Sequence, residues 1–344
     1  MDRKSAVKGI IVVLVLAVAA AGVFGVMNYM EKRSTGSDHD KGKVERESAA
    51  PDPTYLFLGD LEYEVTDNIK AYLLVGTDGA GSKPNAKHYH GPMSDYIMLV
   101  LIDKTKETYG FVQIDRDTMT DIVQIGEDGD EEAAATVEEQ ICTATWFGKD
   151  LNQGLRNLME SVSYLMGGLE IEGYYSINMD DIAKLNHAVG GVTVKIEDDF
   201  SEYDEEMVPG AEVHLTDEQA ELFVRSRMEI GDGTNESRMR RQRAYMTALM
   251  DQAKQKMADD KSFAIDVYQE LNGVATTNIQ GSRVSAIANL LYKFENKGIF
   301  DIDGEHTVGR TDRDKKDYVQ FYADEDSITM ILKELMYLDD GHEY

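Results

Sequence analysis

The chain has 344 residues and 42% of them are hydrophobic, so it is long enough for one large domain or two ordinary ones with an apolar core. Its formal net charge of -29 argues against sequence-independent nucleic-acid binding, which depends on a basic surface that neutralises phosphates. A polyanionic ligand must therefore be held by a local cluster of arginines or by a metal ion, against an unfavourable overall field. The single cysteine, Cys142, excludes an internal disulfide.

An uncharged, mostly apolar run covers residues 9–30, with basic residues on both sides of it. A membrane-spanning helix needs about 20 apolar residues, so this segment is long enough to cross a bilayer. The basic residues within 1–8 favour a cytoplasmic N-terminus, although Lys32 and Arg33 beyond the run weaken that bias. A cleaved signal peptide is the alternative, because 17–22 is rich in small residues. We favour an uncleaved anchor, since the apolar run continues to Met27 and beyond; in either case the rest of the chain is predicted to be exported.

Residues 31–55 are polar and contain two prolines, which predicts a flexible stalk. From residue 56 to 344 the composition is that of a globular domain, predicted to be extracellular. Within it, apolar runs predict strands at 69–75, 96–102, 108–114, 173–177 and 192–196. Helical spacing and capping residues predict helices at 151–165, 180–188, 216–225 and 238–257, followed by mostly helical structure that ends with 327–338. Helices that alternate with buried strands indicate an α/β fold with a central sheet between helical layers.

Two aspartates lie at the ends of neighbouring predicted strands. Asp78 follows the first strand, and Asp95 opens the second. Ligands usually bind at strand ends in open α/β sheets, and Mg²⁺ prefers carboxylate and substrate phosphate oxygens. The pair is therefore a candidate Mg²⁺ site, although each aspartate taken alone is more often a turn residue or a helix cap.

Arginines follow the third strand and return much later in the chain. Arg116, between Asp115 and Asp117, could reach the same pocket or form a surface ion pair with either aspartate. Arg225 and Arg227 are two residues apart, so both reach one pocket only if their helix ends between them, near residue 226.

The last predicted polar group lies on the long helix. Arg238, Arg241 and Gln242 have the spacing i, i+3 and i+4, so they share one helix face. Arg240 and Arg243 lie away from that face and are predicted to be solvated. The plainer alternative for this segment is a basic, exposed helix.

Together these segments resemble the LytR–CpsA–Psr family of cell-wall ligases. The matching stretches occur in the family's order over residues 69–250, and their combination is specific although no single motif is. They read AYLLVGTDG, SDYIMLVLID, FVQIDRDTM, YYSINMDDIAKLNHAVGGVTVKI, LTDEQAELFVRSRM and SRMRRQ.

The resemblance implies a three-layer α/β/α sandwich with a central mixed sheet and a deep apolar lipid pocket. It implies transfer of a phosphate-linked glycopolymer, such as a teichoic acid or capsule, from a polyprenyl pyrophosphate carrier to a sugar hydroxyl of peptidoglycan. Asp78 and Asp95 match the family's Mg²⁺-binding aspartates, and Asp117 matches an acidic position that we expect to orient the neighbouring arginine. The positions that match the pyrophosphate-binding and catalytic group are Arg116, Arg225, Arg227, Arg238 and Gln242, with Arg241 beside Gln242 in the motif.

The chain departs from the family pattern at three positions. Met93 stands where the family usually has an arginine, Asp115 where it commonly has a proline, and Asn235 where it usually has an aspartate, with Asp232 nearby. A methionine at 93 cannot bind phosphate as an arginine does, so the preceding segment could supply that interaction instead. The candidates in that segment are Lys87, His88 and His90. The plainer expectation is that they are solvated side chains of a loop.

Two other functions remain open from the sequence. The same site could hydrolyse a polyprenyl pyrophosphate with water as the acceptor, or the chain could be a non-catalytic exported lipid-binding or regulatory protein. No DNA-binding motif is visible, which disfavours regulation at DNA. For transfer, Asp95 or Asp117 is the candidate that accepts the proton of the acceptor hydroxyl.

Overall fold

A computed structural model describes residues 54–79, 90–124, 135–260, 263–310 apart from 272, 281, 282, 284, 285, 288, 289 and 292, then 316–338 and 342–343. The predicted cytoplasmic tail at 1–8, the anchor at 9–30 and all but the last two residues of the stalk lie outside this part of the chain. Within the described ranges, we find no helix with the length and apolar character needed to cross a bilayer.

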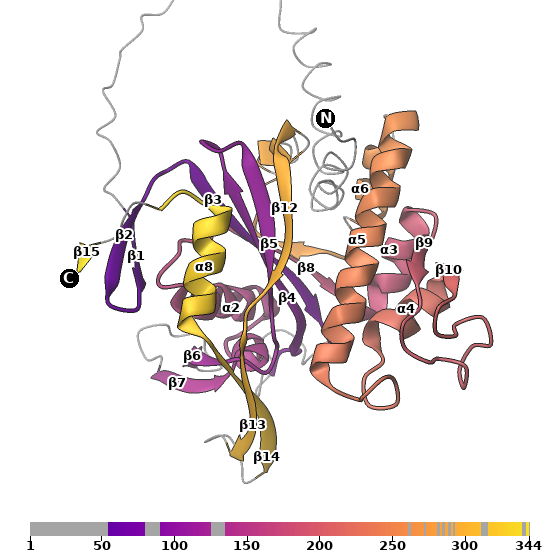
Figure 1. Cartoon of the computed structure of the whole chain (residues 1–344), viewed down its shortest axis with the longest axis horizontal. Coiled ribbons are helices and arrows are strands. Elements are labelled where there is room, and N and C mark those ends of the chain that lie inside the picture. The colour runs from indigo at the N-terminus through magenta and orange to yellow at the C-terminus, as the bar shows by residue number, and fades with distance from the viewer. Residues whose placement is uncertain are drawn as a thin grey trace, which may run out of the picture.

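A six-stranded mixed sheet forms the centre of the domain, with strand order β11-β8-β3-β4-β5-β12 (Figure 1). The three strands β3, β4 and β5 pair antiparallel, while β8 runs parallel to β3 and β12 runs parallel to β5. Nearly every side chain of the inner strands is buried, as a sheet covered on both faces requires. The strands are β3 (Ile69–Thr77), β4 (Ser94–Asp103), β5 (Thr108–Ile114), β8 (Tyr174–Asn178), β11 (Thr276–Thr277) and β12 (Glu295–Asp301).

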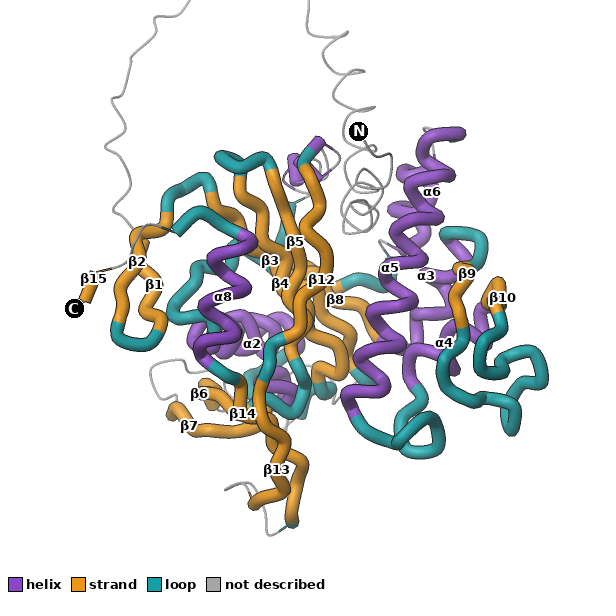
Figure 2. Tube along the Cα trace, in the orientation of Figure 1, coloured by secondary structure: helices purple, strands orange, loops and turns teal. Residues whose placement is uncertain are grey.

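Helices cover both faces of the sheet (Figure 2), which confirms the predicted α/β/α sandwich. Alternate residues of β3 divide between two cores because successive strand side chains point to opposite faces. Tyr72 and Leu74 pack toward α3 (Ile182–Ala188), α4 (Asp217–Arg225), α5 (Asn235–Asp259) and α6 (Phe263–Leu271). Leu73 and Val75 pack toward α2 (Leu151–Leu165) and α8 (Glu325–Leu335).

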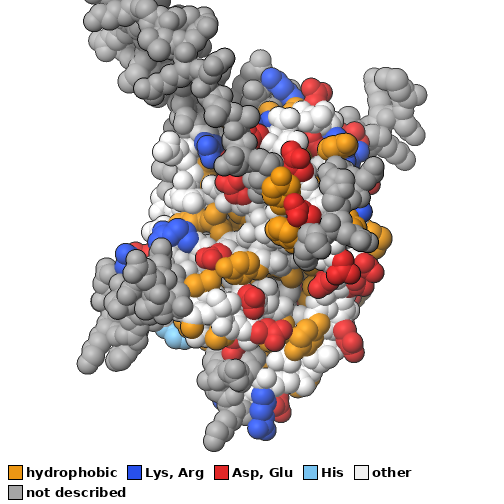
Figure 3. Space-filling view, turned by 90° about the vertical axis from the view of Figure 1, so that its left-hand side faces the viewer, with side chains coloured by type: hydrophobic (Ala, Val, Ile, Leu, Met, Phe, Trp, Pro, Cys, Tyr) orange, Lys and Arg blue, Asp and Glu red, His pale blue; other side chains and the backbone are white. Residues whose placement is uncertain are grey.

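Acidic side chains are scattered, rather than gathered into one patch, over the face on the side of β1 (Thr54–Leu58) and β2 (Leu61–Val65) (Figure 3).

Smaller elements surround the sandwich. The remaining elements are β1 (Thr54–Leu58), β2 (Leu61–Val65), β6 (Met119–Gln124), β7 (Ala135–Gln140), β9 (Val192–Lys195), β10 (Glu212–Leu215), β13 (Gly304–Arg310), β14 (Asp317–Ala323), β15 (His342–Glu343) and the 3₁₀ helices η2 (Ile141–Trp146) and η3 (Met179–Asp181).

The predicted strands and helices up to residue 257 occur within a few residues of their expected bounds. The prediction of mostly helical structure after that point is wrong, because β12, β13 and β14 occupy most of 295–323. The side chains of β13 are nearly all exposed, so no alternation of apolar and polar residues marks it as a strand. Its conformation comes instead from residue-by-residue antiparallel pairing with β14.

Candidate functional site

The two predicted metal-binding aspartates lie together at one end of the β3–β4 pair. Asp78 directly follows β3, and Asp95 is the second residue of β4. The Asp78 amide donates to the Met93 carbonyl at 2.9 Å, and the Met93 amide donates to Asp78 Oδ1 at 2.5 Å, so the turn side of β4 fixes this carboxylate. Burial, followed by the charge of Asp95, raises the pKa of Asp78. The two carboxylates therefore share one partly desolvated space.

Arg116 reaches this space from the end of β5. Its Nη1 donates to Asp95, and its Nη2 lies 2.8 Å from Met93 Sδ and 3.2 Å from Cys142 Sγ. The guanidinium side chain is only 13% exposed, so it is a partner of Asp95 inside the site and not the surface ion pair that the sequence left open. Met93, which replaces a family arginine, packs its sulfur against the same guanidinium.

Asp117 lies between two arginines. Its Oδ1 is 3.6 Å from Arg116 Nε and accepts a hydrogen bond from Gln140 Nε2 at 3.0 Å, while its Oδ2 is 3.6 Å from Arg227 Nη2. Burial and then the charge of Asp115 raise the pKa of Asp117, and the arginines oppose that shift. This arrangement is what an orienting carboxylate for Arg116 and Arg227 requires.

The end of α4 separates the two arginines that the sequence paired. The helix ends at Arg225, and Ser226 is extended with ψ 139°, which turns Arg227 toward Asp117. Arg225 instead pairs with Asp180 and with Glu221, the latter at 2.7 Å. The predicted helix end is confirmed, but the two side chains bind different carboxylates in this structure.

The three residues predicted to share a face of α5 do lie on its buried side. Arg238 is 5% exposed and its Nη1 is 3.4 Å from Asp95 Oδ2. Gln242 lies beside Gln113 of β5 and the Val224 carbonyl of α4.

Arg241 has its donors committed to the protein, because it contacts Asp198 Oδ2 at 2.6 Å and the carbonyls of Phe223 and Ser226. It therefore fastens the end of α4 that carries Arg227. Whether it also touches a ligand stays a prediction.

The prediction that Arg240 and Arg243 are solvated is wrong for Arg243. That side chain is 26% exposed and bonds Asp301, because β12 runs along the edge of the sheet beside α5. Arg240 is 42% exposed and contacts Glu197 and Asp198.

Several buried polar atoms of this cluster have no hydrogen-bond partner within the described chain. They are the Nε atoms of Arg116, Arg227 and Arg238, together with Asp117 Oδ2. A buried donor without an acceptor costs free energy, and native proteins rarely keep several in one place. Three such donors on converging guanidiniums are suited to an anionic ligand.

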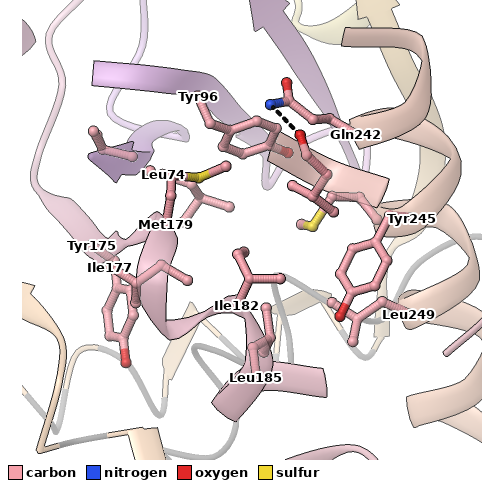
Figure 4. A pocket seen from close by; sticks show the side chains of 14 residues that line it. Leu74, Tyr96, Tyr175, Ile177, Met179, Ile182, Leu185, Gln242, Tyr245 and Leu249 are labelled. Atoms are coloured by element: carbon pink, nitrogen blue, oxygen red, sulfur yellow. Dashed lines mark hydrogen bonds between the residues drawn. The ribbon is translucent and has the colours of Figure 1, made fainter. Parts of the chain in front are cut away.

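An apolar pocket lies between the sheet and helices α3, α4 and α5 (Figure 4). It measures about 610 Å³ including the space at its mouth, and Ile182, Leu185 and Leu249 line it. Gln242 also lines it, one helical turn from Arg238. Gly76 borders it, and a Cβ there would lie 2.5 Å from Met179 Sδ and 2.9 Å from Tyr96 Cβ, so a side chain would fit only if these neighbours shifted. The polar site and the pocket therefore adjoin, as the resemblance predicts.

The donor set at Asp78 and Asp95 fits Mg²⁺. No group of three or more potential metal-binding side chains occurs in the described part of the chain, but Mg²⁺ is commonly held by one or two carboxylates plus substrate phosphates. Burial and then the neighbouring charge of Asp95 raise the pKa of Asp78, and a cation held between the two carboxylates would oppose that shift. Each Asp95 oxygen already faces an arginine, so a metal ion would use the remaining lone pairs.

Sequence reasoning gave no role to several residues that support the cluster. Asp115 and Asn235 were recognisable only as departures from the family, yet their side chains bond each other at 2.7 Å. His306, on β13, bonds Asp115 from almost two hundred residues away and carried no sequence signal. Among the predicted replacements for the arginine at Met93, His90 packs against Trp146, while Lys87 and His88 lie outside the described residues.

Fold and site together define an α/β/α domain in which a cluster of buried arginines and aspartates adjoins an apolar pocket. The LytR_cpsA_psr family model matches residues 26–336, and the chain belongs to that family.

Known proteins resemble the chain in sequence and in fold. The teichoic acid transferase TagU of Halalkalibacterium halodurans, named a polyisoprenyl-teichoic acid–peptidoglycan transferase, is 28% identical over 176 residues, which are 51% of this chain and 52% of that protein. The chain thus spans about half the length of the curated relatives it matches. Protein gbs0355 of Streptococcus agalactiae has a TM-score of 0.60 at 20% identity, covering 80% of this chain and 91% of its own. The crystal structure of B. subtilis TagV gives 0.54 at 20% identity, covering 79% and 97%. At these identities the structural likeness shows the fold alone.

Proposed function

We propose that the chain transfers a phosphate-linked glycopolymer of the teichoic acid type from a polyprenyl pyrophosphate carrier to a sugar hydroxyl of peptidoglycan. The observation that carries this proposal is the meeting of unpartnered guanidinium donors with an apolar pocket at one end of the sheet. A polyprenyl pyrophosphate has the matching chemistry, a diphosphate on a long hydrocarbon chain. The names of the relatives, which are transferases from a polyisoprenyl carrier to peptidoglycan, support the choice of donor and acceptor.

In this proposal the polyprenyl chain occupies the pocket and the diphosphate faces Arg116, Arg227 and Arg238. Guanidiniums that are already oriented by Asp95 and Asp117 stabilise the charge that develops on the leaving and transferring phosphates. Gln242 joins the pocket to this group, and Arg225 follows the pocket residue Val224 at the end of α4.

Asp78 and Asp95 would hold Mg²⁺, which when bound supplies Lewis-acid stabilisation of pyrophosphate oxygens. Asp117 is 4% exposed, so it acts by orienting arginines. Asp95 is 17% exposed, so of the two candidates it is the one that an acceptor hydroxyl can approach, although two arginines already face its oxygens.

The apolar run at 9–30 completes the proposal as a single-pass anchor with a cytoplasmic N-terminus and an extracellular domain. An anchor of this kind keeps the lipid pocket near the membrane surface from which the carrier comes.

The test is a transfer assay with radiolabelled lipid-linked glycopolymer, Mg²⁺ and the full-length protein. Label that becomes insoluble with added peptidoglycan supports the transferase. Release of free glycopolymer phosphate regardless of peptidoglycan would support the pyrophosphate hydrolase instead. Lipid that co-purifies with the protein, identified by mass spectrometry, but with no turnover in either arm, would support the non-catalytic lipid-binding protein.

A further inference from the structure

A continuous chain of hydrogen bonds links β13 to the diphosphate site. His306 Nε2 lies 3.0 Å from Asp115 Oδ2, and Asp115 Oδ1 accepts from Asn235 Nδ2 at 2.7 Å. Asn235 Oδ1 then accepts from Arg238 Nη2 at 2.6 Å, and Arg238 faces Asp95. Three members of this chain, Asp115, Asn235 and Arg238, are each at most 5% exposed.

The chain fixes the orientation of Arg238. The Asn235 amide has its nitrogen toward a carboxylate, so its oxygen must face the guanidinium. An aspartate at 235 would put two carboxylates within hydrogen-bond distance at Asp115. Asp115 and Asn235 both depart from the family pattern. Asp115 thus fits an asparagine at position 235 and not the aspartate that the family usually has there.

The charge on this chain depends on His306. This side chain is 38% exposed and packs on Phe321 with ring centroids 4.7 Å apart. The titratable groups that face it are acidic: Asp115 and Asp117 from the loop after β5, and Glu236 from the first turn of α5. The hydrogen bond to Asp115 is the main cause that raises the pKa of His306, and burial opposes it.

We propose that His306 is a positioning residue that, through Asp115 and Asn235, holds Arg238 and neutralises the buried carboxylate behind the diphosphate site. This inference rests on the proposed function. Protonated His306 offsets the charge of Asp115, so a diphosphate meets one negative charge fewer behind Arg238. Neutral His306 still donates from Nε2 but leaves an uncompensated carboxylate near an anionic ligand, which weakens binding.

The raised pKa of His306 determines whether diphosphate affinity rises or falls with pH. Protonated His306 is favoured in the folded chain, so its effect is complete below its ordinary pKa of about 6.5 and disappears as the pH rises through the raised value. Diphosphate affinity should therefore fall with rising pH by a step that belongs to His306, in addition to any titration of the ligand itself.

The experiment is calorimetric binding of farnesyl diphosphate with Mg²⁺ to the full-length protein at about pH 6 and about pH 9. His306→Gln keeps a neutral donor toward Asp115. We expect its affinity to be about fivefold lower than wild type at the acidic pH and equal to wild type at the alkaline pH, as expected for removal of one nearby charge. His187→Gln is the matched control, because His187 also bonds an aspartate, Asp217, but at the end of α4 opposite Arg225.

Asp115→Asn removes the carboxylate that His306 offsets while keeping an acceptor for Asn235. We expect its affinity at about pH 9 to be at least that of wild type at about pH 6 once the titration of the ligand is subtracted, because no uncompensated carboxylate remains behind Arg238. The same pH ratio in wild type and in His306→Gln would overturn the inference alone. Absence of binding by wild type at both pH values would overturn the proposed function, and this inference with it.

Discussion

Replacing Arg116 by lysine tests the diphosphate site most directly. Lysine keeps the positive charge but loses the planar fork, so one group can no longer face Asp95 and Asp117 while offering a further N–H to a phosphate. Loss of one preorganised donor to a developing oxyanion costs about 100- to 1000-fold in rate. We expect Arg116→Lys to lower transfer by at least about 100-fold.

Substitutions of Arg116 should affect the thermal stability of the domain less than its transfer activity. Arg116→Ala removes a cation from a mostly buried pair, which costs about 3 kcal/mol, the low end of the usual range, because Arg238 and Arg227 remain near the two aspartates. For a domain of this size, that lowers the melting temperature by about 6 °C. The lysine variant keeps the charge and should melt within about 3 °C of wild type.

The assay is transfer of labelled glycopolymer to peptidoglycan, run beside thermal denaturation of each variant. Arg283→Ala is the control, because that side chain forms an ion pair with Glu172 while 55% exposed, and its loss should change neither readout appreciably. If the folded lysine variant retains a third or more of wild-type transfer, Arg116 does not bind the reacting phosphates and the proposed site is wrong.

Three further predictions concern the pocket, the metal site and the support of α4. Ile182→Trp should fill the apolar pocket, so calorimetry should show at least tenfold weaker binding of long prenyl diphosphates with little change for isopentenyl diphosphate; equal losses for both would contradict the pocket's role. Asp78→Asn should raise the melting temperature in metal-free neutral buffer, because the pKa of Asp78 is raised in the fold and its ionised form is therefore unfavourable at neutral pH. With Mg²⁺ added, the same variant should lack the rise in melting temperature that we expect for wild type. Arg241→Ala should destabilise the fold by about 3 kcal/mol in denaturant unfolding, the low end of the usual range, because Asp198 loses its buried partner but keeps Arg240; a loss of transfer at full stability would instead indicate contact with the ligand.

The sequence by itself determined the central strands and most of the helices. The runs at 69–75, 96–102 and 108–114 are apolar on both faces, and only a strand covered by two layers buries such a run. The helix end between Arg225 and Arg227 was also predicted, although it was inferred from a shared pocket and the two arginines bind different carboxylates. Such local patterns predict the structure correctly because the pattern of each segment agrees with its environment in the folded domain.

Only the tertiary structure decided which charges meet. Arg243 contacts Asp301 and His306 contacts Asp115, and neither hydrophobic periodicity nor motif spacing relates these residues in the sequence. Strand β13, which carries His306, is exposed and has no apolar pattern by which it could be predicted. Arg241 was indistinguishable in sequence from Arg238, yet it fastens α4 while its neighbour faces Asp95. A residue's partner across the fold depends on strand order and helix packing, which are long-range properties, whereas sequence patterns report mainly on neighbours within a few residues.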